Sequence, residues 1–152
     1  MKRRLASKNE EEIRKISVEL RFLEQTAEAL QSRLSMLNAV TQDLTYANMT
    51  LDSLEKEKEN SELLVPIGGT SYIRAKLDNP DNIIVGIGAG VSVEKKRQEA
   101  KELIKKRLED LEKARTSTQQ QFVQVAGKIN EDRERFEELA ATVRGEKTSQ
   151  NV

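Results

Sequence analysis

Two long segments with apolar residues at heptad spacing constrain the fold of this chain more than any other feature of its sequence. In the first segment, one series is apolar at every position: Ile16, Leu23, Leu30, Leu37, Leu44 and Leu51. A second series runs through Ile13, Leu20, Ala27 and Leu34, and then becomes polar at Thr41 and Asn48. A repeat of 3.5 residues that persists this long indicates a coiled coil rather than a helix lying on a globular core.

The second segment shows the same spacing over a similar length, with apolar residues at most of its stripe positions. The stripe consists of Ile104, Leu108, Leu111, Arg115, Thr118, Phe122, Val125, Ile129, Asp132, Phe136, Leu139 and Val143. Two helices of equal length with a compact connector are expected to fold back as an antiparallel coiled-coil hairpin. One register pairs positions whose numbers sum to 159, so that Leu23 meets Phe136, Leu20 meets Leu139 and Thr41 meets Thr118. A neighbouring register that sums to 152 remains an alternative.

Between the two segments lies a short stretch that contains both prolines and five of the seven glycines of the chain. Its β-prone segments are 63–67, 71–77, 83–87 and 91–93, with turns expected at 68–70, 79–82 and 88–90. The sequence therefore predicts an α+β fold, a long antiparallel coiled-coil hairpin with two small β-hairpins between its helices. The predicted parts are a flexible N-terminal tail (1–9), a first coiled-coil helix (10–61), a β-hairpin oligomerisation region (62–93), a second coiled-coil helix (94–145) and a flexible C-terminal tail (146–152).

The predicted strands are too short to make a core of their own. Strands of about five residues with a face of Ile, Val and Leu need a further layer or further strands to cover that face. Their edges also present unpaired N–H and C=O groups, which favour pairing with another chain. We therefore expect the β region to drive oligomerisation.

The composition excludes several kinds of function. The chain has no His and no Cys, which rules out a serine triad, thiolate chemistry and His-containing metal sites. Its 26 basic and 26 acidic residues leave no positive surplus for a nucleic acid. No run of apolar residues is long enough for a membrane span or a signal peptide, so we expect a soluble protein that is not exported. The lack of Cys fits a cytoplasmic location.

The glycine-rich run Gly86-Ile87-Gly88-Ala89-Gly90 invites comparison with phosphate-binding loops. Such loops require a strand, the glycine turn and then a helix within a βαβ unit. Here the glycines lie between two β-prone segments, so a hairpin turn is the better interpretation, and a nucleotide-dependent enzyme is kept only as an alternative. The polar run 116–121 allows a hinge or contact patch, or simply a solvated helix face with one polar core layer.

Six apolar residues lie near the ends of the predicted helices, farthest from the β region. They are Ile13, Ile16, Leu20, Phe136, Leu139 and Val143. One interpretation makes them ordinary coiled-coil core. The other is that the helices separate there and offer apolar surface to a partner, because helix ends open at low cost. Both interpretations can hold together.

The β region also resembles a known family. The run LVPIGGTSYIRA at 64–75, and IIVGIGAGV at 83–91 continuing into Val93-Glu94-Lys95, are similar to the alpha subunits of archaeal prefoldin. The resemblance covers residues 10–145, and two hairpins rather than one are typical of the alpha class. The helices themselves are generic coiled coil, so the specificity rests on the β region.

This resemblance implies a chaperone that works without ATP and without a cofactor. It would be a hexamer of two alpha and four beta subunits, whose hairpins form intersubunit β-barrels from which six coiled coils project. Unfolded client proteins would be held at the coiled-coil tips and passed to a group II chaperonin. The six residues near the helix ends would bind clients. Oligomerisation would use Ile67, Tyr72, Ile73, Ala75, Ile83, Val85, Ile87 and Val91. The alternative is a coiled-coil scaffold or adaptor that binds folded partners.

Overall fold

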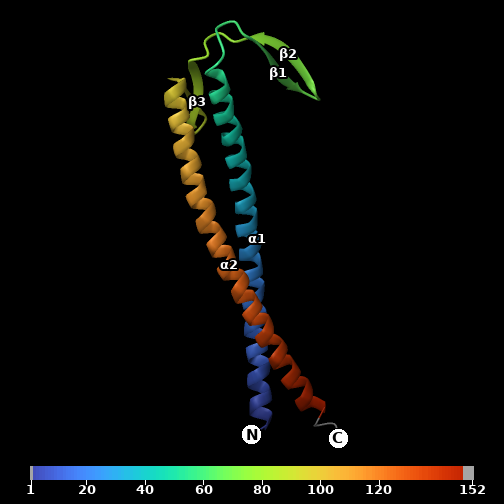
Figure 1. Ribbon diagram of the computed structural model, residues 1–152. Helices are drawn as coiled ribbons and strands as arrows, with labels where there is room; N and C mark the ends of the chain where they lie inside the picture. Colours follow the sequence, from blue (N-terminus) through green and yellow to red (C-terminus); the bar gives the residue numbers. More distant parts are fainter. Residues whose placement is uncertain (1, 149–152) are drawn as a thin grey trace. The chain divides into compact units, whose positions relative to one another are not determined.

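The structure, a computed structural model, describes the backbone of residues 2–148 and the side chains of residues 8–145. Along the chain, four short strands lie between two long helices (Figure 1). The elements are α1 (Lys2–Leu54), β1 (Glu62–Gly68), β2 (Ser71–Lys76), β3 (Asn82–Gly88), β4 (Val91–Lys96) and α2 (Arg97–Thr148). The chain divides into two units: a terminal unit, residues 1–37 and 114–152, and a hairpin unit, residues 38–113.

The heptad positions form the contact face of the two helices, which confirms the coiled-coil prediction. Every residue of the two α1 series is buried or half-buried. On α2, Arg115 is the exception, because it is exposed while the preceding Ala114 is half-buried. The long side chain of Arg115 leaves the stripe and the smaller Ala114 takes its place toward α1.

The helices pair in the register that sums to about 152, one heptad away from the register that pairs Leu23 with Phe136. In the hairpin unit, Lys101 forms an ion pair with Asp52, and Leu44 and Leu108 pack on the same apolar cluster. In the terminal unit, Arg133 pairs with Glu24 at 2.7 Å. The residue numbers of this pair sum to 157. Those of a second pair in the same unit, Arg135 with Glu12, sum to 147, so the two pairs lie on either side of 152.

The helices do not end where the sequence suggested. Helix α1 begins at Lys2, so the predicted tail at 1–9 is helical over its described residues, whose composition contains no Gly or Pro to stop the helix. Helix α1 ends at Leu54 rather than near residue 61, because its last turn tightens into i to i−3 hydrogen bonds such as Glu57 N–H to the Leu54 carbonyl, 3.2 Å. Of the predicted C-terminal tail, 146–148 are helical and 149–152 lie outside the described residues.

Both hairpins are antiparallel and turn in the same way. The φ angles are 54° and 59° at Gly69 and Thr70, and 48° and 75° at Ala89 and Gly90. Two successive positive φ angles define the tight type I′ turn that matches the twist of the strands. The register shifts by one residue just before each turn, at Gly68 and at Gly88. The two predicted hairpins are thus confirmed, and they remain separate two-stranded sheets, with no closed barrel among the described residues.

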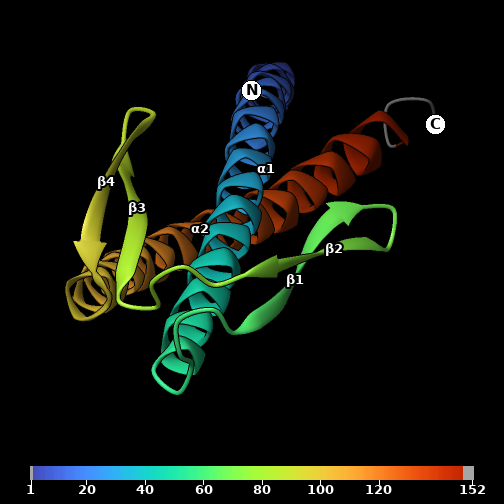
Figure 2. The ribbon, with the colours of Figure 1, turned by 90° about the horizontal axis from the view of Figure 1, so that it is seen from above.

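The two hairpins differ in how they contact the helices. A buried cluster joins Val85 of β3 to Leu51 of α1 and to Ala100 and Ile104 of α2. Ile83 packs against the same cluster, so β3–β4 lies against the helices. No residue of β1 or β2 belongs to that cluster, and this hairpin extends away from α1 within the hairpin unit (Figure 2).

Candidate functional site

The six residues near the helix ends lie in the contact face between α1 and α2. Ile16 and Val143 are buried, and Ile13, Leu20, Phe136 and Leu139 are half-buried. In the register that sums to 152, Phe136 lies opposite Ile16 and Leu139 lies opposite Ile13. These residues therefore form successive core layers of the terminal unit, and a partner would reach them fully only after the helices separate.

One polar side chain interrupts these apolar layers. Asp132, 4% exposed, occupies a heptad position of α2, and its Oδ1 accepts a hydrogen bond of 2.7 Å from the Lys128 ammonium. Its other oxygen, Oδ2, is buried and has no hydrogen-bond partner among the described residues. This hydrogen bond raises the pKa of Lys128, and the carboxylates of Glu19 and Glu131 raise it further against the opposing effect of burial.

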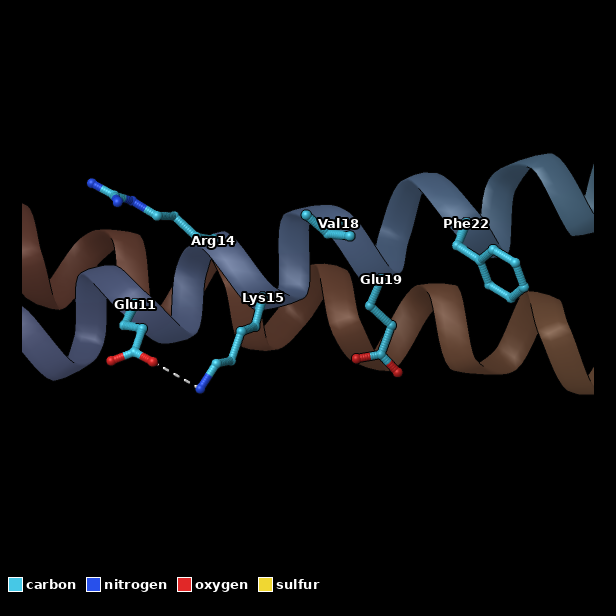
Figure 3. A pocket seen from close by; sticks show the side chains of 6 residues that line it. All are labelled: Glu11, Arg14, Lys15, Val18, Glu19 and Phe22. Carbon is cyan, nitrogen blue, oxygen red and sulfur yellow. Dashed lines mark ion pairs between the residues drawn. The ribbon is translucent and has the colours of Figure 1, made fainter.

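A second apolar surface lies on the outer side of α1 in the same unit. Val18 and Phe22, one helical turn apart, are 67% and 68% exposed. They line a shallow groove together with Arg14 and Glu19, and with the ion pair between Glu11 and Lys15, 3.0 Å (Figure 3). The Lys15 ammonium holds the pKa of Glu11 below its ordinary value through its hydrogen bond and its charge.

Val18 and Phe22 were not among the residues predicted to bind clients. Both lie outside the heptad series, where a coiled coil normally carries polar residues. An apolar pair at i and i+4 on such a face is a signal that can be found from sequence, because those residues have no helix partner to cover them. We call Val18 and Phe22 the outer apolar pair.

The eight predicted oligomerisation residues separate into two groups. Five are exposed: Ile67, Tyr72, Ile73, Ile87 and Val91. Ala75 is half-buried. Val85 and Ile83, in contrast, pack on the helices of their own chain. The prediction that these two face another subunit is therefore not supported, because α1 and α2 already cover that face of β3.

The glycine run forms a hairpin turn and not a phosphate loop. Gly88, Ala89 and Gly90 connect β3 to β4, and α2 begins only after Lys96. The backbone N–H groups of a helix N-terminus therefore do not follow the glycines, as a phosphate site requires. Among the described residues, no group of three or more Asp, Glu, His or Cys side chains is placed to hold a metal ion. None of the described helices combines the length and apolar character of a membrane span.

Comparison with known proteins agrees with this arrangement of helices and hairpins. The profile described as "Prefoldin subunit" matches residues 23–142. Prefoldin subunit alpha of Pyrococcus horikoshii is 31% identical over 134 residues, which cover 88% of this chain and 90% of the relative. The putative prefoldin subunit alpha of Aquifex aeolicus is 32% identical over 122 residues, 80% of this chain and 82% of the relative. A chain of the filamentous prefoldin of Methanocaldococcus jannaschii superposes with a TM-score of 0.63 at 26% identity, covering 73% of this chain and 92% of that chain.

Two helices that pair along heptad stripes, with two β-hairpins between them, define a coiled-coil subunit of a larger assembly. The chain belongs to the prefoldin family, and the curated relatives that it matches over most of its length are alpha subunits. The family consists of chaperone subunits rather than enzymes.

Proposed function

We propose that this chain is a holdase subunit that captures unfolded polypeptides without ATP, through the apolar side chains of its terminal unit. The observation that carries the proposal is the exposure of the outer apolar pair, Val18 and Phe22, which line one shallow groove on the outer side of α1. Unfolded chains display apolar side chains in no fixed arrangement, and a shallow open groove suits such ligands better than a shaped pocket. The six core residues of the same unit add to this surface when the helices separate.

We further propose that the hairpins join this chain to beta subunits, in a hexamer of two alpha and four beta chains that closes intersubunit β-barrels. The support is the exposed apolar side chains of β1–β2, Ile67, Tyr72 and Ile73, together with strand edges that have no partner in the described chain. Several copies of a weak capture surface then act on one client, and the effective concentration gives avidity. Transfer of the client to a group II chaperonin in the cytoplasm completes the proposed role.

Suppression of client aggregation tests the capture surface. The purified assembly is added to citrate synthase diluted from denaturant, and light scattering follows aggregation. Val18→Ser with Phe22→Ser should weaken protection several-fold. The control is Met49→Ser, which removes another exposed apolar side chain, 58% exposed, from α1 in the hairpin unit. Equal loss of protection in both variants contradicts the proposed surface, and absence of protection by the unchanged protein contradicts the holdase role.

Assembly is tested separately, by native mass spectrometry of the chain co-expressed with a prefoldin beta subunit. Ile73→Asn should prevent the mixed hexamer, whereas Arg74→Asn, on the opposite face of β2, should permit it. A coiled-coil adaptor would neither assemble with the beta subunit nor protect the client. Assembly of this chain with itself alone would contradict the two-to-four composition.

A further inference from the structure

Within the terminal unit, the layer that contains Asp132 differs from its neighbours. In the register that sums to 152, Asp132 lies opposite Leu20, between the layer of Ile129 with Leu23 and the layer of Phe136 with Ile16. Ile129 and Ile16 are buried and the other three are half-buried. A carboxylate thus occupies a position that the adjoining layers fill with apolar side chains.

The environment of Asp132 satisfies only half of its carboxylate. Oδ1 is paired with Lys128 on the same helix, one turn away, and Oδ2 is buried without a hydrogen-bond partner in the part of the chain that the structure describes. An ionised group that leaves water without full compensation destabilises the state in which it is buried. Because Lys128 belongs to α2 itself, the ion pair survives when the helices separate, whereas the burial of Oδ2 ends. The free-energy cost of burying Oδ2 therefore destabilises only the state in which α1 and α2 are paired.

The charged groups around this layer do not supply the missing partner. On α1, Glu19 lies near Lys128 and carries the same charge as Asp132. Arg133 and Arg135 of α2 form cross-helix ion pairs with Glu24 and Glu12, and so are engaged elsewhere. On α2, Glu131 is a further carboxylate beside Lys128. Water is the partner that Oδ2 gains when the helices part.

We propose that Asp132 is a built-in weak point at which the terminal unit opens, so that the apolar layers between Asp132 and the helix ends become accessible. The layers concerned are those of Phe136 with Ile16 and of Leu139 with Ile13, together with Leu20, which loses its cover when Asp132 moves into water. Opening from Asp132 to the helix ends exposes all six residues that were expected to bind clients, since the buried Val143 lies still nearer the end of α2. The assignment of this opening to client capture rests on the proposed function, but the opening itself does not.

Hydrogen exchange of the assembled protein, followed by mass spectrometry, measures the opening directly. Asp132→Leu replaces the carboxylate by the side chain that its heptad position favours, and should slow exchange of amides in 12–20 and 133–143 at least tenfold. Asp132→Asn removes the charge and keeps the shape, and should slow exchange by a smaller factor. Glu134→Leu is the matched control, since it adds the same side chain at an exposed position of α2. Circular dichroism of each variant verifies that its helices are formed.

The outcomes distinguish the separation of the helices at Asp132 from its proposed role in client capture. Unchanged or faster exchange in both Asp132 variants, with helices intact, overturns the weak point, as does equal slowing by Glu134→Leu. If exchange slows as expected, citrate synthase protection should fall several-fold in Asp132→Leu. Slowed exchange with full protection overturns the link to capture, and leaves the holdase role to the outer apolar pair. Failure of the unchanged protein to protect the client contradicts the proposed function and leaves the exchange result standing.

Discussion

The docking of β3–β4 on the helices can be tested with a double-mutant cycle between Leu51 and Val85. Both side chains lie in the buried cluster, at 5% and 6% exposure. Leu51→Ala removes three carbons from a closed cluster and should lower the free energy of unfolding by about 2–5 kcal/mol. Val85→Ala removes two carbons, about 1.6 kcal/mol by transfer alone, and somewhat more with the cavity left behind.

Because the two side chains share one cluster, their effects should not add. The loss in the double variant should differ from the sum of the single losses by about 0.5–3 kcal/mol. Urea unfolding followed by circular dichroism, at one fixed protein concentration, gives the four free energies. Met49→Ala, an exposed position on the same helix, should change the free energy of unfolding by less than about 0.5 kcal/mol. If the effects of Leu51→Ala and Val85→Ala are additive, β3 does not dock on α1 and the reasoning fails.

Three further predictions concern packing, turn geometry and charge. Ala100 is fully buried, so Ala100→Leu should overpack the cluster and lower the free energy of unfolding by about 1–3 kcal/mol in urea, whereas Ala29→Leu at an exposed position should not. Ala89 holds φ at 48°, which favours glycine, and Ala89→Gly should raise the midpoint of thermal unfolding; a lower midpoint would contradict the type I′ turn. The pKa of Lys128 is raised above its ordinary 10.5, so its stabilising contribution is complete below that pH and is lost as pH rises through the raised pKa. The difference in thermal midpoint between the wild-type protein and Lys128→Gln should therefore shrink at strongly alkaline pH, and a constant difference would argue against the ion pair.

The heptad pattern was sufficient to predict the pairing of the helices, because residues such as Leu23 and Leu37 have only one way to be covered. The register of the helices was harder to predict. One register pairs Thr41 with Thr118, and the sequence does not show whether that polar pair stabilises the helices more than ion pairs such as Asp52 with Lys101. The N-terminal limit of α1 was not predicted, because the heptad series begins only at Ile13, whereas the residues before it contain no Gly or Pro to stop a helix.

The candidate surfaces were harder to predict than the elements that carry them. Both faces of β3 are apolar, with Val85 on one and Ile84 on the other, so alternation alone could not show which face meets the helices. Near the helix ends, periodicity identified Ile16 and Phe136 as apolar stripe residues but could not say that they cover each other. Phe22 lies outside the heptad stripe, so the periodicity that predicts the helix pairing carries no signal for its exposure.

Among the described residues, β3 but not β1 or β2 contributes to the buried cluster on the helices, and this difference has a kinetic consequence. A two-stranded hairpin alone in water is only marginally stable, whereas β3–β4 can be held by the helices of its own chain. The helices and β3–β4 can therefore form in a first-order process that does not depend on dilution. Stable ordering of β1–β2 needs a collision with a second chain, and its rate rises with subunit concentration. Tyr72 lies in β2, and Tyr46 is the other tyrosine of a chain without tryptophan, so the fluorescence of Tyr72 in a Tyr46→Phe variant can follow this bimolecular step.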